Sequence, residues 1–436
     1  MFPSIYVVFI LSVCIVCMLP LSLKYGLFLP SIQSQIISYW GYPSEAYDVV
    51  TEDGFILGVY RIPYGKGENS ERTGKRPIFY LQHGMFVSAS SWVANPPYTS
   101  LAFTLADSGY DVWMGNSRGS VWSQKHVHYS PESPEFWAFS FDEMAKYDLV
   151  ATLNFIMKKT NQEKLYYVGH SQGTTIAFAA FSTNPKLAQR IEFFFALAPM
   201  VSVQHSRGPL KTLMSIPPSL LKVRIFAPKY LHPLKSTSFP NSFFLSQSRL
   251  DVYLSQNPAG TSVQNIVHWN QVRIQKSFLA PRSGGNWFFF PFNCTQVTPP
   301  LYDLEAIKIP TAIWSGEQDR IAPPREVDNL LPKLPNLIYH KKIPYYNHID
   351  FLLGLDTPQE FFHEILYLIK MYMKHYRPCR FLVSAWEAGR LQGWEKGETW
   401  CSSWEGTFPF LFSAPCWGSG KENKHLLTPT MHRGLY

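Results

Sequence analysis

The stretch Leu165–Phe178, LYYVGHSQGTTIAF, decides the fold. Its first residues favour a β-strand, and the residues after Ser171 favour a helix. Between them Gly169–Gly173 reads GHSQG, a G-x-S-x-G pattern at a strand-to-helix junction. Side chains at the two glycines would collide with neighbouring backbone, and the tight bend holds the serine hydroxyl exposed at the top of a sheet. The stretch therefore predicts a nucleophilic serine, with an ordinary tight turn as the alternative.

The segments around this stretch alternate between short apolar runs and helical patterns. Residues 45–63 predict a hairpin that turns at Glu52-Asp53-Gly54. Strands are predicted at 76–84, 111–119, 191–199, 309–319 and 336–344, and helices at 98–110, 141–159, 325–334 and 357–376. This alternation predicts an α/β fold with a mostly parallel central sheet and helices on both faces.

The alternation of strand and helix patterns is interrupted in the middle of the chain and ends before the C-terminus. Residues 200–298 are rich in proline, with short helical patches and little strand alternation, so we expect a helical cap inserted into the sheet protein. The core is then split into residues 33–199 and 299–376. Residues 377–436 mix Trp, Gly, Ser and Cys without a helical or strand period. We expect a poorly ordered extension there, with an extra domain as the weaker alternative.

The N-terminus indicates a secretory route. No residue from Phe2 to Leu23 is charged, so residues 1–23 predict a signal peptide or a signal anchor, with cleavage favoured over retention. Asn293 begins an Asn-Cys-Thr glycosylation acceptor, which agrees with a lumenal path. We expect a protein that is secreted or resides in a lumen such as that of the lysosome.

The composition narrows the class of protein. Apolar residues make up 46% of the 436 residues and charged residues only 16%, which is typical of a packed globular enzyme. The net charge is +8, but the basic residues are scattered, so no nucleic-acid partner is expected. The six cysteines lack the spacing of metal ligands, so no metal site is expected.

A nucleophilic serine needs a base and an orienting acid, which follow it along the chain in this type of fold. Asp319 follows one predicted strand and His348 follows the next, so both fall where open α/β sheets place their chemistry. We predict that Ser171, Asp319 and His348 form the catalytic triad. The rival residues are Glu317, Asp328 and Asp350 as acids and His340 as a base.

Backbone N–H groups are expected to stabilise the oxyanion. The loop LQHGMF follows a predicted strand, and Gly84 lets its backbone approach the substrate. We assign the N–H groups of Met85 and Gln172 as the two donors. His83 precedes this glycine and is expected to be structural rather than catalytic.

These residues resemble the acid lipase family, which includes gastric and lysosomal acid lipases. The resemblance covers about Gln33 to His375 and is carried by long stretches such as YLQHGMFVSASSW, YYVGHSQGTT, RLDVYLSQNPAGTSVQN and NLIYHKKIPYYNHIDF. It implies an α/β-hydrolase fold with a helical cap, with Ser171, Asp319 and His348 at the triad positions and Met85 and Gln172 at the oxyanion-hole positions. The chain departs from the family in a shorter cap, whose stretch 226–253 contains no cysteine, and in the extension after Tyr376.

Together these observations predict a serine ester hydrolase. The resemblance implies fatty-acyl esters of neutral lipids, such as acylglycerols or steryl esters, as substrates at a lipid–water interface. No cofactor is expected, because the triad and the backbone donors supply all the chemistry. The alternatives are a lipid-binding protein of the same fold without turnover, and a thioesterase or acyltransferase. The oligomeric state is not specified by the sequence.

Overall fold

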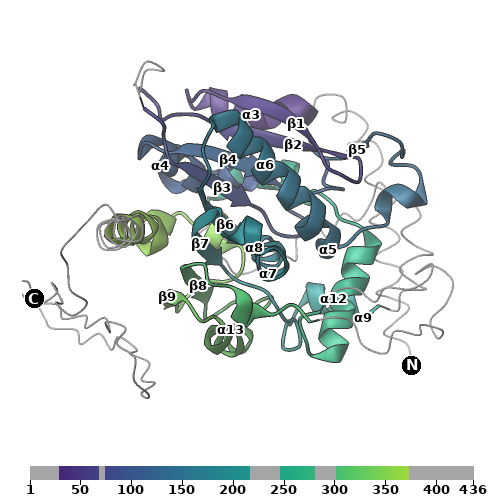
Figure 1. The fold of residues 1–436 in the computed structure, drawn as a ribbon. Helices are drawn as coiled ribbons and strands as arrows, with labels where there is room; N and C mark the ends of the chain where they lie inside the picture. Colours follow the sequence, from purple (N-terminus) through teal and green to yellow (C-terminus); the bar gives the residue numbers. More distant parts are fainter. Residues whose placement is uncertain (1–28, 68–73, 217–245, 280–300, 373–436) are drawn as a thin grey trace, which may run out of the picture. The chain divides into compact units, whose positions relative to one another are not determined.

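A central sheet organises the described part of the chain (Figure 1). The computed structural model describes residues 29–67, 74–216, 246–279 and 301–372, all of which belong to one unit, Met1–Met373. The predicted leader at 1–23, the acceptor Asn293 and the extension at 377–436 lie outside the described residues. The described fold therefore consists of this sheet and the helices that cover it.

The sheet has nine strands among the described residues, in the order β1-β2-β4-β3-β6-β7-β8-β9, with β5 paired to β2. Neighbouring strands from β4 to β9 run parallel, whereas β2 is antiparallel to β1, β4 and β5. The mostly parallel sheet is thus confirmed. The strands are β1 (Glu45–Val50), β2 (Phe55–Ile62), β3 (Ile78–Gln82), β4 (Asp111–Gly115), β5 (Lys125–His126), β6 (Leu165–His170), β7 (Ile191–Leu197), β8 (Thr311–Gly316) and β9 (Leu337–Ile343).

The inner strands are buried on both faces. Every residue of β3, β4, β6 and β8 is buried, which explains why these segments are continuous apolar runs rather than alternating patterns. The hairpin strand β1 alternates between exposed and more buried positions, because it lies at an edge of the sheet. The apolar runs therefore mark the centre of the sheet.

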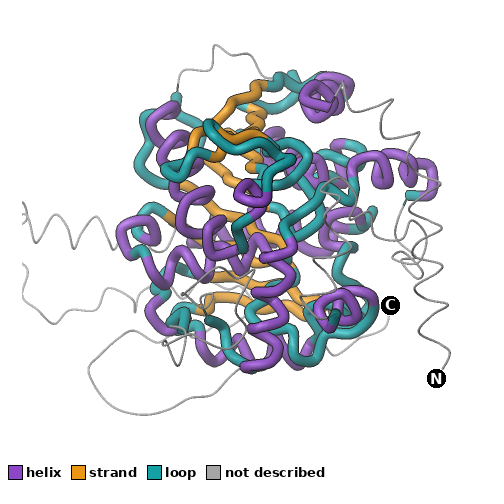
Figure 2. The backbone as a smooth tube through the Cα atoms, turned by 90° about the vertical axis from the view of Figure 1, so that its right-hand side faces the viewer, coloured by secondary structure: helices purple, strands orange, loops and turns teal. Residues whose placement is uncertain are grey.

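Helices cover both faces of the sheet, which Figure 2 shows as strands enclosed by helices. One apolar core contains side chains of α6, α7, α12 and α13, and the other contains side chains of α3, α4, α11 and α14. The helices are α3 (Leu29–Tyr39), α4 (Leu101–Asp107), α5 (Phe141–Glu143), α6 (Leu149–Thr160), α7 (Gln172–Thr183), α8 (Pro185–Ala188), α9 (Pro209–Ser215), α11 (Leu250–Gln256), α12 (Val263–Gln275), α13 (Pro324–Leu330) and α14 (Asp350–Leu353). None of the described helices is long and apolar enough to cross a membrane.

The structure differs from the sequence prediction in several helices. The single helix predicted at 141–159 is divided, because a π-helical turn at Met144–Asp148 separates α5 from α6. Another π-helical turn, Pro358–Phe362, begins the closing helix, which continues through residues 363–372. The helix α3 and the short strand β5 were not predicted at all.

The described part of the predicted cap is helical. It comprises α9, α11 and α12, together with a 3₁₀ turn at Gln247–Arg249. The longest of these helices, α12, begins at a serine cap, where the side chain of Ser262 accepts a hydrogen bond from the N–H of Asn265. The boundaries at 200 and 298 stay a prediction, since residues 217–245 and 280–300 lie outside the described part.

A buried ion-pair network joins the hairpin turn to the π-helical turn. The guanidinium of Arg118 donates through Nε to Asp148, at 2.7 Å, and through both terminal nitrogens to Asp53, at 2.6 and 2.9 Å. Its side chain is only 1% exposed, and it lies over the ring of Phe55 at 4.1 Å. Asp148 is buried as well, with a side chain only 7% exposed, whereas the Asp53 side chain is 28% exposed. The network therefore fixes three separate segments against one another.

Removing this cation should be strongly destabilising. We expect Arg118→Met to lower the free energy of unfolding by about 3–5 kcal/mol at neutral pH, because Asp148 would be left buried without its partner. Lys125→Met is the matched control, since it breaks an exposed ion pair with Asp48 and should cost about 1 kcal/mol or less. Urea denaturation measures both, and equal losses would contradict the structural role of Arg118.

Candidate active site

The predicted bend at Ser171 is present between β6 and α7. Ser171 has φ of 54° and ψ of −122°, a backbone conformation that residues other than glycine rarely adopt. A Cβ atom on Gly169 would lie 2.8 Å from the carbonyl carbon of Gly173, and one on Gly173 would overlap the carbonyl oxygen of Gln82. Only glycines fit at these two positions, so the backbone holds the serine at a fixed point above β6.

The structure brings together Ser171, His348 and Asp319. The Nε2 atom of His348 lies 2.7 Å from the Ser171 Oγ, and its Nδ1 lies 2.7 Å from an Asp319 carboxylate oxygen. Because a carboxylate only accepts, Nδ1 carries the proton and Nε2 is free to accept from the serine hydroxyl. The arrangement is that of a nucleophile, a base and an orienting acid.

The carboxylate of Asp319 is itself held by the backbone. Its second oxygen accepts hydrogen bonds from the N–H groups of Ile321 and Ala322, each at 2.8 Å. The side chain has no exposed surface, and the residues Ser171 and His348 are each only 6% exposed. A carboxylate fixed on both oxygens holds the imidazole in one orientation and one tautomer.

The order of the strands explains why distant residues meet. Ser171 follows β6, Asp319 follows β8 and His348 follows β9. These strands are parallel and connected through β7, so their carboxyl ends lie at the same edge of the sheet. The order of the strands therefore places the three side chains at the same edge of the sheet.

The rival residues make other contacts. Glu317 is exposed to solvent, and Asp328 pairs with Lys342 at 3.1 Å. Asp350 accepts from the N–H of Asn347 at 2.8 Å, and His340 lies 2.9 Å from the hydroxyl of Ser315. The hydrogen-bonded chain that starts at Ser171 thus runs through His348 and Asp319.

The loop after β3 approaches the serine closely. A Cβ atom on Gly84 would lie 2.8 Å from the Cβ of Ser171. Met85 is the next residue of this loop, and Gln172 is the first residue of α7, whose first-turn N–H groups lack intrahelical acceptors. Both predicted donors are therefore adjacent to the nucleophile, and their role in the oxyanion hole stays a prediction.

His83 uses both ring nitrogens to hold this loop. Its Nδ1 donates to the carbonyl of Gly84 at 2.7 Å, and its Nε2 accepts from the N–H of Ser117 at 3.0 Å. Burial lowers the pKa of His83 to about 4, so the ring is neutral near neutral pH. These contacts agree with the structural role expected from the sequence.

His170 contacts the predicted base His348 and was missed by sequence reasoning. Its Nε2 donates to the main-chain carbonyl of His348 at 2.9 Å, and the two rings lie 4.9 Å apart. Burial, reinforced by the nearby His348, holds the pKa of His170 well below its usual range. Its position inside the GHSQG motif was the available signal, but the sequence does not show which carbonyl it contacts.

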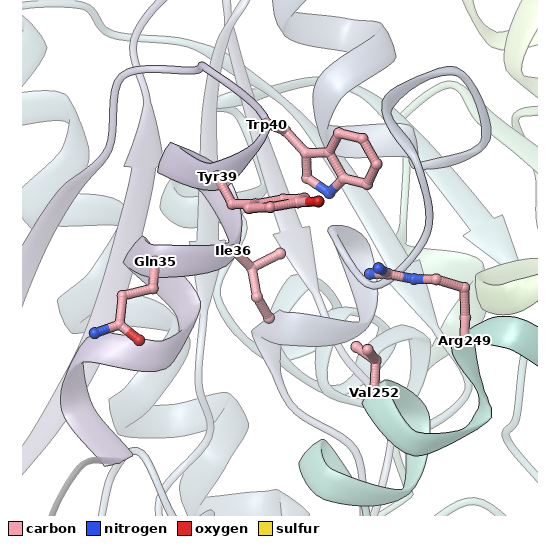
Figure 3. A pocket seen from close by; sticks show the side chains of 6 residues that line it. All are labelled: Gln35, Ile36, Tyr39, Trp40, Arg249 and Val252. Atoms are coloured by element: carbon pink, nitrogen blue, oxygen red, sulfur yellow. The ribbon is translucent and has the colours of Figure 1, made fainter.

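A pocket of about 290 Å³ lies away from these residues, between α3 and α11 (Figure 3). Arg249 anchors α11 there by donating to the carbonyl of Ala94 at 3.0 Å. None of the predicted site residues lines this pocket, so it is not the site of the triad. Its lining residues are Gln35, Ile36, Tyr39, Trp40, Arg249 and Val252.

The comparison with known proteins agrees with this geometry. A family model for the alpha/beta hydrolase fold matches residues 77–355, and a model for the partial alpha/beta-hydrolase lipase region matches residues 33–96. The chain is thus an α/β hydrolase by fold.

Among the described residues, no cluster of histidine, cysteine and carboxylate side chains is arranged to hold a metal ion.

The relatives of this chain define the family more narrowly. Lipase member K from Homo sapiens is 53% identical over 78% of this chain and 91% of its own length. Gastric triacylglycerol lipase from Mus musculus is 54% identical over 76% and 90%, and lysosomal acid lipase/cholesteryl ester hydrolase from Macaca fascicularis is 47% identical over 78% and 90%. The chain belongs to the acid lipase family, and the resemblance noted in the sequence is confirmed.

The burial of His83 should make stability depend on pH. Its pKa falls from 6.5 to about 4 on folding, so the unfolded chain takes up this proton first as the pH falls. Between these values each pH unit should lower the free energy of unfolding by about 1.4 kcal/mol. His83→Gln keeps a donor and an acceptor but does not titrate, so it should lack this contribution.

Urea denaturation of both proteins at pH 7 and pH 4.5 tests this expectation. The stability of the wild type relative to the variant should fall by about 2–3 kcal/mol between the two pH values. His128→Gln, a substitution of an exposed histidine, is the control. Parallel pH profiles for the wild type and His83→Gln would show that His83 is not held neutral in the fold.

Proposed function

We propose that this protein hydrolyses fatty-acyl esters of neutral lipids through an acyl-enzyme on Ser171. The carrying observation is the hydrogen-bonded chain in which His348 lies 2.7 Å from both the Ser171 hydroxyl and the Asp319 carboxylate. The strained backbone at Ser171 and the membership of the acid lipase family support the same assignment. The reaction is an acyl transfer to serine, followed by transfer to water.

In the proposed mechanism each of these residues has a role. His348 takes the proton of Ser171 as the hydroxyl attacks the ester carbonyl, and Asp319 stabilises the imidazolium that forms. The N–H groups of Met85 and Gln172 hold the negative oxygen of the tetrahedral intermediate. His348 then gives the proton to the leaving alcohol. The same base activates a water molecule, which releases the fatty acid and regenerates the serine.

The surroundings of the nucleophile favour an apolar acyl group. The hydroxyl of Ser171 lies 3.2 Å from the sulfur of Met200, which belongs to a buried apolar cluster. Met85 and Phe86 pack against the same cluster. Two relatives are named for triacylglycerol and cholesteryl ester. Neutral lipid esters at a lipid–water interface are therefore the proposed substrates, and the uncharged leader supports action in the secretory pathway or outside the cell.

Activity-based labelling tests the nucleophile. A fluorophosphonate probe should modify Ser171 alone, and Ser171→Ala should abolish both labelling and turnover of a short-chain nitrophenyl ester. Asp319→Asn should reduce kcat by about 10⁴-fold, because the imidazole loses its orienting carboxylate. Ser182→Ala is the control, since this hydroxyl lies on α7 but donates to the carbonyl of Ala179. Labelling that persists in Ser171→Ala would refute the assignment.

The acyl and acceptor preferences separate the alternatives. We expect turnover of nitrophenyl esters and of emulsified triacylglycerol, with free fatty acid as the product, because water completes the reaction. A protein that binds lipid without turnover would hydrolyse neither substrate. A thioesterase would prefer acyl thioesters, and an acyltransferase would pass the acyl group to an added alcohol in preference to water. Product analysis across these substrates distinguishes the reactions.

A further inference from the structure

The side chain of Gln172 is clamped by the cap. Its carbonyl oxygen accepts two hydrogen bonds, from the Asn265 amide and from the indole N–H of Trp269, each at 2.8 Å. Gln172 is only 3% exposed, and its amide group lies 3.5 Å from the sulfur of Met144. The residue that follows the nucleophile is thus fixed by side chains that are remote in the sequence.

Both donors lie on one face of α12. Asn265 and Trp269 are four residues apart, so they lie one above the other on the helix. Figure 1 shows α12 beside α5 and α7, in agreement with these contacts. The described part of the cap therefore contacts the core directly at the start of the helix that carries Gln172.

Asn265 and Trp269, which we call the clamp, are held in place by further contacts. The side-chain oxygen of Asn265 accepts from the N–H of Phe141 at 2.9 Å, and its amide also donates to Thr261 at 3.0 Å. Trp269 has no exposed surface and packs against the ring of Phe141 at 5.0 Å. Since both donors have fixed positions, they restrict where the Gln172 side chain can lie.

This restriction bears on the oxyanion. Gln172 supplies one of the two N–H groups assigned to the negative oxygen, and such donors act only when they are oriented in advance. The preceding residue, Ser171, has a strained backbone that must be held by its surroundings. A side chain anchored by two hydrogen bonds limits the rotation of the same residue's backbone.

We propose that Asn265 and Trp269 are positioning residues of the oxyanion hole. The helix α12 then completes the catalytic geometry by fixing Gln172, in addition to covering the site. The inference rests on the proposed function, because it assumes that the N–H of Gln172 serves the reaction. Neither Asn265 nor Trp269 touches the reacting atoms in this scheme.

Trp269→Phe provides the first test, because it removes the indole donor and keeps an aromatic ring. We expect kcat for a short-chain nitrophenyl ester to fall about tenfold, less than the 10²–10³-fold loss of a whole donor, while KM changes by less than about twofold. The affinity for an aliphatic trifluoromethyl ketone should fall by a similar factor, because its tetrahedral adduct places an oxyanion at the same point.

A double-mutant cycle shows whether the effect passes through Gln172. Gln172→Met removes the side-chain carbonyl but keeps the backbone N–H. In that background Trp269→Phe should cause little further loss of kcat, because its hydrogen-bond partner is already gone. Val272→Ala is the matched packing control, since Val272 is buried on the same helix. It should leave kcat and ketone affinity near the wild-type values.

Asn265→Asp tests the second donor without a change of volume and replaces Trp269→Phe if that variant does not fold. The aspartate keeps the acceptor for Phe141 but, when ionised, cannot donate to Gln172. We expect reduced kcat at neutral pH and recovery relative to the wild type at lower pH, where the protonated carboxyl donates. Loosened packing alone would not produce this pH-dependent recovery.

The outcomes are separable from those of the proposed function. If Ser171→Ala keeps full activity, the proposed function fails, and the clamp, which rests on it, fails too. If Ser171→Ala is inactive, three results would each overturn the clamp: wild-type kcat and ketone affinity in Trp269→Phe, an equal loss in Val272→Ala, or additive effects in the double-mutant cycle. Wild-type kcat in Asn265→Asp at every pH would overturn it as well.

Discussion

The close approach of two backbones at Gly173 is the constraint on which the site depends. The first turn of α7 lies so near the end of β3 that a methyl group on Gly173 would overlap the Gln82 carbonyl. This contact holds the helix close to the sheet, and the bend at Ser171 that joins them has a positive φ of 54°. The packed aromatic core on both faces supplies the stability that such strain requires. The position of the Ser171 hydroxyl therefore depends on the packing of the helix and the sheet around it.

The histidines around the serine differ in their partners rather than in their burial. His83 and His170 each donate to a main-chain carbonyl, and desolvation lowers the pKa of both. His348 instead donates to the carboxylate of Asp319, so a positive charge formed on its ring during the reaction has an immediate counter-ion. The first two hold the backbone of the loop after β3 and of His348. Only the third is arranged to exchange a proton with Ser171.

Much of the fold and the site geometry followed from local sequence patterns. Apolar runs ending in glycine loops located the parallel strands, and the rule that chemistry lies at their carboxyl ends indicated Asp319 and His348. That rule does not distinguish Asp319 from Glu317, because both follow β8. The π-helical turn at Met144–Asp148 was missed, because its apolar residues have the spacing of an ordinary helix. The contacts of Trp269 with Gln172 could not be predicted either, since they depend on how the cap packs onto the core.

The position of β8 next to β7 has a consequence for synthesis on the ribosome. Residues 198–310, which include the predicted cap, are translated between these neighbouring strands, so β7 is made well before its partner β8. During that interval the Phe193–Phe195 run of β7 has an unpaired edge, and an unpaired apolar edge is a template for aggregation. Early coverage of this edge would therefore protect the nascent chain from aggregation, and a chain released before β8 is made would leave the edge without its partner strand.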